Sequence, residues 1–195
     1  MAANSPYTDP AKNAFVKTNL FYTDKNYHHF LNLYKKYIPP VAETFAWCLL
    51  KNHFHFLVKI RSASEICDFF SIKKEKATRK PSQQFAHLFN AYVQAIDKQN
   101  ARHGSLLETP FRRKHIKNES YLKNLILYIH NNPIQHNFVE KIEQYRWSSY
   151  TSIISNQKTA IERDKVLAQF ENKENFIYCH QQKMEITSLE KWLKL

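Results

Sequence analysis

Glycine is almost absent from this chain of 195 residues, which contains only Gly104. A dinucleotide-binding GxGxxG loop needs three glycines and a Walker A loop needs two, because only glycine lets the backbone approach a phosphate so closely. The sequence therefore excludes both kinds of nucleotide-binding loop. We expect no nucleotide cofactor, and any chemistry on nucleic acid has to proceed without a phosphate loop.

Cysteine pairs and long apolar runs are also missing. Cys48, Cys67 and Cys179 lie far apart with no CxxC pair, which predicts buried, reduced thiols rather than a disulfide framework or a zinc knuckle. No apolar run reaches the roughly 18–20 residues of a membrane span, and the N-terminal sequence MAANSPYTDPAKN lacks the apolar core of a signal peptide. We expect a cytoplasmic protein with no membrane partner.

Acidic residues are outnumbered by basic ones. The chain has 17 Asp and Glu against 29 Lys and Arg, which gives a formal net charge of +12. This excess favours a polyanionic partner, either nucleic acid or an anionic membrane surface, over an acidic one. The alternative is a basic protein whose charge serves only its solubility.

The hydrophobic pattern predicts one α+β domain, with helices packed on a small antiparallel sheet. Pro133 should end the fourth predicted helix, and residues 1–13 are expected to be loose. The predicted helices cover 25–37, 64–70, 82–101, 118–131 and stretches near 160–172 and 183–194, and the predicted strands are a central one through the apolar run 45–58 and a pair at 105–107 and 111–116.

The stretch KNHFHFLVK, residues 51–59, places His53 and His55 inside the apolar run. In a strand, residues i and i+2 point to the same face and their Cα atoms are about 6–7 Å apart. Both imidazoles would then reach one point, where their neutral nitrogens could bind a divalent metal. The alternative is a pair of half-buried histidines with ordinary hydrogen bonds.

The helix predicted over 118–131 carries a second candidate group. Tyr128 lies at the border of its buried face, and Asn132 follows one turn later. A tyrosine hydroxyl can attack phosphorus, and a carboxamide oxygen can complete a metal site begun by two histidines. The alternative is a packing tyrosine followed by an Asn-Pro pair that ends the helix.

Four separated segments of the chain form a recognisable set. They are FAWCLLKNHFHFLV at 45–58, GSL with PFRR at 104–106 and 110–113, YIHNNPI at 128–134, and YRWSSY at 145–150. In order and spacing they resemble the single-strand HUH tyrosine transposases, and most closely their REP-associated, insertion-sequence-like branch. The resemblance covers about residues 19–155.

The resemblance implies a ferredoxin-like fold, a homodimer, and DNA transposition by a transposase. In such an enzyme His53 and His55 bind a divalent ion, magnesium or manganese, with Asn132 as third ligand or neighbour of the site. Tyr128 attacks single-stranded or hairpin DNA and leaves a 5′-phosphotyrosine. Residues 1–155 would form the transposase-like domain, and residues 156–195 a helical C-terminal extension.

A basic cluster is expected to hold the DNA, with a solvated strand edge as the alternative reading of the same residues. It consists of Arg112, Arg113, Lys114 and Lys117.

The chain departs from the family pattern at two places. Lys51 stands where the family commonly has proline, and nothing before Asn19 matches the family's first strand with its His and Arg-Gly pattern. A DNA-binding descendant that has lost cleavage is therefore the main alternative function. A metal-dependent hydrolase in which Tyr128 only packs is a further one.

Overall fold

The computed structural model describes residues 7–10, 19–70, 80–101, 106–107, 113–116, 118 and 121–182. Of residues 7–10 it describes the backbone alone. All structural statements below concern these parts of the chain.

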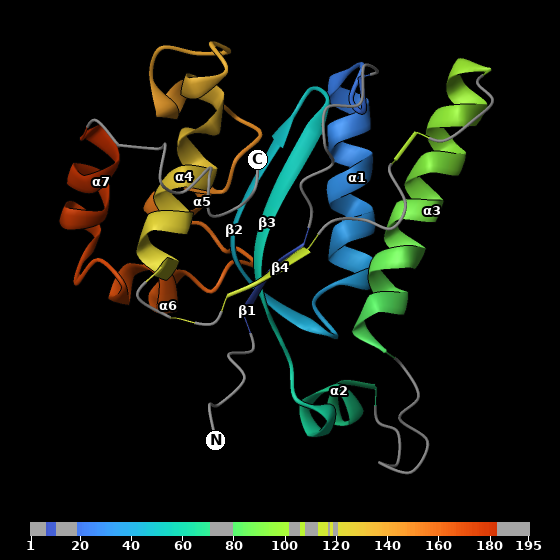
Figure 1. Ribbon diagram of the computed structural model, residues 1–195, viewed down its shortest axis with the longest axis horizontal. Helices are drawn as coiled ribbons and strands as arrows, with labels where there is room; N and C mark the ends of the chain where they lie inside the picture. The colour runs from blue at the N-terminus through green and yellow to red at the C-terminus, as the bar shows by residue number, and fades with distance from the viewer. Residues whose placement is uncertain are drawn as a thin grey trace.

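A four-stranded antiparallel sheet with the spatial order β2-β3-β1-β4 forms the centre of the fold (Figure 1). One helix separates β1 from β2, and two helices separate β3 from β4, so that the chain follows the ferredoxin-like order and confirms the predicted α+β class. The elements are β1 (Tyr7–Pro10), α1 (Asp24–Tyr37), β2 (Ala42–Leu50), β3 (His53–Ile60), α2 (Ala63–Phe70), α3 (Pro81–Asn100) and β4 (Arg113–His115).

The predicted loose segment 1–13 contains an inner strand of this sheet, so the prediction was wrong for residues 7–10. β1 pairs with β3 through Tyr7 and Thr8, and with β4 over Thr8–Pro10. A strand does therefore precede Asn19, although it lacks the family's His and Arg-Gly pattern. Its four residues give no alternating pattern from which a strand could be predicted.

The apolar run 45–58 is a hairpin and not one continuous strand, which corrects the predicted central strand. Leu50 pairs with His53, and Lys51 and Asn52 form the turn between β2 and β3. The turn contains no glycine, so its sequence carries little of the usual hairpin signal. A tertiary contact holds it instead, because the carbonyl of Lys51 accepts hydrogen bonds from the backbone nitrogens of Leu20 and Phe21 at 2.8 and 3.0 Å.

Alternation along β3 divides the helices between the two faces of the sheet. Phe54 and Phe56 face α1 and α3, where their rings contact Phe30 and Phe89. His53 and His55 point to the opposite face, which the helix α4 covers. Figure 1 shows α1 and α3 on one side of the strands, with α4 and the last helices on the other. These later elements are α4 (Tyr121–Gln135), the short 3-10 helix η2 (Ile142–Gln144), α5 (Tyr150–Ile154), α6 (Arg163–Ala168) and α7 (Lys173–Gln181).

Helix α4 continues through Pro133 to Gln135, so the predicted end at residue 131 was wrong. The side-chain amide of Asn132 donates to the carbonyl of Tyr128 at 2.8 Å, and the backbone helical pattern resumes with His136 N to Asn132 O at 3.0 Å. The helix stops at Asn137, whose φ of 57° is left-handed, and Phe138 N donates to the carbonyl of Pro133 at 2.8 Å. This pattern is a Schellman cap, which needs no proline to end a helix.

Other predictions can be compared in part. Leu106 and Leu107 lie in a bend rather than in the predicted strand at 105–107, and Ser105 is outside the described residues. The predicted helix near 160–172 is the shorter α6, α7 was not predicted, and the stretch 183–194 is also outside the described residues. In the part of the chain that the structure describes, no helix combines the length and the apolar character needed to cross a membrane.

Candidate active site

His53 and His55 lie on the same face of β3, as the sequence predicts. Their ring centres are 5.3 Å apart and the ring planes are almost perpendicular, at 89°. Both side chains are buried, with 4% and 1% of their surface exposed. Two imidazoles that bind one ion through nitrogens at about 2.1 Å would have ring centres roughly 4.5–5.5 Å apart, so the observed spacing is compatible with a shared ligand.

The neighbouring Asn52 determines which ring nitrogen of His53 carries the proton. Its Oδ1 lies 2.9 Å from His53 Nδ1. A carboxamide oxygen only accepts hydrogen bonds, so Nδ1 carries the proton and Nε2 carries the lone pair. Metal-binding histidines commonly have this arrangement, in which one nitrogen donates to an oxygen and the other is available to an ion.

Helix α4 presents a stripe of side chains to these two histidines. The ring of Tyr128 lies 5.7 Å from that of His55, and the ring of His136 lies 5.1 Å from that of His53. Asn132 is one helical turn from both Tyr128 and His136, so it lies between two residues that contact the histidine pair. The structure therefore brings the four predicted residues His53, His55, Tyr128 and Asn132 into one region, although they come from two separate elements.

Asn132 is fully buried, and its two amide atoms have different surroundings. Nδ2 donates to the carbonyl of Tyr128, which fixes the orientation of the group. Oδ1 is also buried but accepts no hydrogen bond from any described residue. A buried carbonyl oxygen left without a partner costs about 1–3 kcal/mol, so it is a candidate ligand atom.

His136 is a site residue that sequence reasoning missed. It is exposed, in contrast to His53, and stands at the open end of the stripe. The spacing Tyr128, Asn132, His136 is i, i+4, i+8, which places all three on one helix face. The sequence analysis did not place His136 on this face because the predicted helix ended before Pro133.

The candidate metal ligands are thus two imidazoles and one carboxamide. Within the described ranges, no three or more His, Cys, Asp or Glu side chains are grouped closely enough to hold an ion by themselves. The orphaned oxygen of Asn132 and the spacing of His53 and His55 fit a divalent ion as a mixed nitrogen and oxygen set. His136 is close enough to His53 to act as a neighbour of that site.

Tyr128 is 2% exposed, so its ring is enclosed against the histidine side of the sheet. Tyr121, two turns earlier on α4, is 38% exposed. Tyr150 belongs to another part of the core, where its ring packs on His130 and Phe176, and burial raises the pKa of its phenol to about 12. Of these three tyrosines, Tyr128 contacts the histidine pair.

Two residues of the predicted basic cluster can be placed. Arg113 is exposed and Lys114 is half-buried, and both belong to β4, at the end of the sheet opposite β2. Arg112 and Lys117 lie outside the described residues.

His130, between Tyr128 and Asn132 in sequence, points away from the candidate site. It forms a buried hydrogen-bond chain with His180 and Ser149 at 2.9 and 2.7 Å. Burial and the neighbouring His180 hold the pKa of His130 well below its usual value. His130 therefore takes no part in the candidate site.

Comparison with known proteins gives one structural match to report. No family model and no curated protein matches the sequence. A solved structure described as a REP-associated tyrosine transposase bound to a REP hairpin superposes with a TM-score of 0.53 and 15% sequence identity, covering 77% of this chain and 78% of that one. The match agrees with the family that the sequence motifs resemble. At this identity it shows that the chain has the fold of a REP-associated tyrosine transposase.

Proposed function

We propose that this protein is a metal-dependent single-stranded DNA endonuclease and transposase that forms a 5′-phosphotyrosine intermediate. One observation carries the proposal. His53 and His55 on β3 lie beside the ring of Tyr128 on α4, Asn132 follows one turn later on that helix, and the fold is shared with a transposase. These are the residue types that transesterification at a phosphodiester needs, namely a nucleophile and donors that can hold a cation beside it.

The proposed step exchanges one ester bond for another. The Tyr128 oxygen attacks the scissile phosphorus, an O–P bond forms, and the bond from phosphorus to the 3′-oxygen breaks. The phenolic proton passes to solvent, and the departing strand takes up a proton to end in a 3′-hydroxyl. Because the bond energy is kept in the phosphotyrosine, rejoining needs no nucleotide cofactor, which agrees with the lack of a phosphate loop.

His53 through Nε2, His55, and Asn132 through Oδ1 would hold a magnesium or manganese ion. When bound, the ion supplies polarisation of the scissile phosphate and charge neutralisation. The residues of the chain fix the orientation of the proposed ligand atoms. Asn52 keeps the lone pair of His53 on Nε2, and the hydrogen bond from Asn132 Nδ2 to the helix carbonyl keeps Oδ1 aimed away from that carbonyl.

The proposed partner is single-stranded or hairpin DNA. The structural neighbour was solved with a REP hairpin, and the net charge of +12 suits a polyanion. The residues proposed to contact phosphates are Arg112, Arg113, Lys114 and Lys117. We also propose a homodimer, which light scattering after gel filtration would test.

The burial of Tyr128 favours a second candidate function, DNA binding without cleavage. A nucleophile that is 2% exposed has to become accessible before it can meet a phosphate. A descendant that keeps the fold and the charge would have no need of that opening.

A denaturing gel with hairpin DNA that carries single-stranded flanks and a 3′-label separates these functions. The label remains on the fragment that Tyr128 would hold, so an adduct migrates with the protein. A metal-dependent adduct supports the transposase, and binding without an adduct supports the non-catalytic descendant. Cleaved DNA without an adduct would instead indicate the hydrolase in which Tyr128 only packs.

A further inference from the structure

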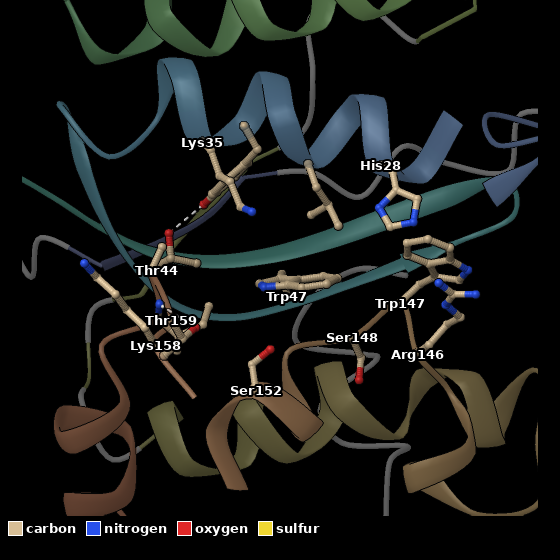
Figure 2. A pocket seen from close by; sticks show the side chains of 14 residues that line it. His28, Lys35, Thr44, Trp47, Arg146, Trp147, Ser148, Ser152, Lys158 and Thr159 are labelled. Carbon is tan, nitrogen blue, oxygen red and sulfur yellow. Dashed lines mark hydrogen bonds between the residues drawn. The ribbon is translucent and has the colours of Figure 1, made fainter. Parts of the chain in front are cut away.

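A cavity of about 640 Å³ lies at the β2 edge of the sheet, and none of the candidate active-site residues lines it. Helix α1 and β2 form one side of it, and α5 with the segments before and after it forms the other (Figure 2). Its volume is within the usual range for pockets that bind small ligands. Nothing described so far assigns it a role.

Trp47 forms the wall of the cavity contributed by β2, and its backbone is fixed at the edge of the sheet. Its nitrogen donates to Ser149 Oγ at 2.9 Å, and its carbonyl accepts from Ser149 N at 2.9 Å. The indole is half-buried, and Figure 2 shows it extending into the middle of the cavity. No described aromatic ring or cation lies over it, so a face of this ring is available to a flat ligand.

The indole of the neighbouring Trp147 is covered by other side chains, in contrast to that of Trp47. Its indole stacks on Tyr27 with ring centres 4.4 Å apart and planes at 9°. The guanidinium of Arg146 also lies over it, 4.6 Å from the ring centre. Trp147 therefore serves as a packed wall, which leaves Trp47 as the indole that can accept a ligand.

The charge around the cavity is entirely basic. Lys35, Arg146 and Lys158 line it, and no Asp or Glu is among the described residues that do. Arg146 is paired with Asp24 at 3.0 Å. Lys35 and Lys158 form no ion pair with any described residue, and in Figure 2 they approach the same end of the cavity from its two sides.

We propose that this cavity binds one nucleotide of single-stranded DNA, with the base stacked on Trp47 and the adjoining phosphates held by Lys35 and Lys158. The inference rests on the proposed DNA partner and adds to it a second contact, remote from Tyr128. A flat, unoccupied indole between free cations matches the way in which single strands are bound, by base stacking and backbone neutralisation. A paired base in a duplex is already stacked on its neighbours and cannot enter a cavity of this kind.

Hydrogen bonds connect the wall of the cavity to the helix of the candidate active site. Ser149 Oγ is hydrogen-bonded both to the backbone nitrogen of Trp47 and to His130 Nε2. His130 belongs to α4, two residues from Tyr128. The wall of the proposed nucleotide site and the helix of the proposed nucleophile are thus anchored on the same serine.

Binding of a short oligothymidylate, measured without added metal and in the presence of a chelator, tests the proposal independently of cleavage. Trp47→Leu should weaken this binding about 5- to 150-fold, because stacking on one aromatic side chain contributes about 1–3 kcal/mol per base. Its binding of a blunt-ended hairpin without single-stranded flanks, whose only unpaired bases are those of the loop, should change less than two-fold. Thermal unfolding of the variant checks that the fold is kept.

Charge variants provide a control that does not alter the core. The double variant Lys35→Gln with Lys158→Gln should weaken oligothymidylate binding several-fold more than Lys36→Gln with Lys141→Gln, which removes the same charge from exposed lysines that do not line the cavity. If the two doubles weaken binding equally, the cavity is not the site. Because they do not depend on replacing Trp47, these doubles decide the question even if Trp47→Leu fails to fold.

The outcomes also separate this inference from the proposed function. If the wild-type protein binds neither oligothymidylate nor hairpin, the DNA partner itself is wrong. If it binds both, and Trp47→Leu binds the oligothymidylate as well as the wild type does, the nucleotide site is wrong and the proposed function stands. Thymidine monophosphate bound as tightly as the oligothymidylate would mean a free-nucleotide pocket and would overturn the proposed strand contact.

Discussion

Two pairs of histidines lie on either side of the α4 backbone and show what the same residue type can do in two environments. His130 and His180 form a closed hydrogen-bond chain, in which each contact has a defined donor. His180 Nδ1 donates to the carbonyl of Phe176, so its Nε2 accepts from His130 Nδ1, and His130 Nε2 accepts from Ser149. Every ring nitrogen of this pair is used within the protein.

The other pair, His53 and His55, has a different kind of neighbourhood. Tyr128 and His136 contact its rings, and Asn132 adds a buried oxygen that no described residue satisfies. The first pair connects α4 to α7, and none of its ring nitrogens is left to bind a ligand. Burial alone does not distinguish the two pairs, and the proposed role of His53 and His55 rests on their convergence with the proposed nucleophile and an orphaned acceptor.

Of the variants that test the difference between the two pairs, His53→Ala should show the largest effect, a loss of metal affinity. Divalent-metal binding is expected to weaken by more than about 100-fold, since losing a ligand costs more than the roughly 10- to 100-fold cost of losing its outer partner. Calorimetric titration with manganese measures this directly. DNA binding in a chelator should stay within about two-fold, because phosphate contacts are untouched. Unchanged manganese affinity would show that the pair is not a metal site.

His130→Ala should affect stability rather than chemistry. The change leaves His180 Nε2 and the Ser149 hydroxyl without their partner and opens a cavity, so we expect a loss of about 2–4 kcal/mol in the free energy of unfolding. Urea denaturation measures it. His53→Ala is the matched control and should lose less, because Asn52, the hydrogen-bond partner of its Nδ1, is half-buried, whereas Ser149 and His180 are buried. The reverse order of the two losses would contradict the structural role assigned to His130.

The pH dependence of folding should reflect the burial of the His130 and His180 pair. Burial lowers the pKa of His180 from 6.5 to about 4, although its bond to Phe176 opposes this. The unfolded chain therefore takes up a proton at higher pH than the folded one, so stability is lost as pH falls from about 6.5 to about 4. His180→Gln should be less stable at pH 7 but should lose less stability over that range. Parallel pH profiles of Tm would contradict this assignment.

A smaller effect is expected from the basic residues of β4. Each phosphate contact contributes about 0.7 to the slope of log affinity against log salt on single strands. With about four to six contacts the wild-type slope should be near −3 to −4. The double variant Arg113→Gln with Lys114→Gln should reduce it by about 1.4, as measured by fluorescence anisotropy. A slope equal to that of the wild type would mean that β4 does not touch the DNA.

The elements that could be predicted from the sequence are those specified by local patterns. The helical spacing of Tyr27, Phe30 and Tyr34 and the stop at Pro39-Pro40 gave α1 to within a residue. Alternation placed His53 and His55 on one face, and the helix wheel placed Tyr128 and Asn132 together. Their convergence across two elements was suggested only by the family resemblance, because no local pattern encodes which helix covers which face.

The failures have a common cause in tertiary contacts. β1 is short and contains Pro10, and it becomes a strand through pairing with β3 and β4. The turn at Lys51–Asn52 is held by the backbone of Leu20 and Phe21 rather than by glycine. The continuation of α4 through Pro133 hid His136, since a proline lacking its amide proton usually marks a helix end.

The central claim is that Tyr128, beside the histidine pair, is the residue that joins to DNA. The direct measurement is adduct formation on 3′-labelled hairpin DNA with manganese or magnesium, followed by mapping of the modified peptide, for the wild type, Tyr128→Phe, Tyr121→Phe and Tyr150→Phe. We predict an adduct on Tyr128 in the wild type and in the last two variants, and none in Tyr128→Phe, which should still bind the hairpin. An adduct that persists in Tyr128→Phe, or wild-type protein that binds the hairpin with either metal and never forms one, would contradict the account.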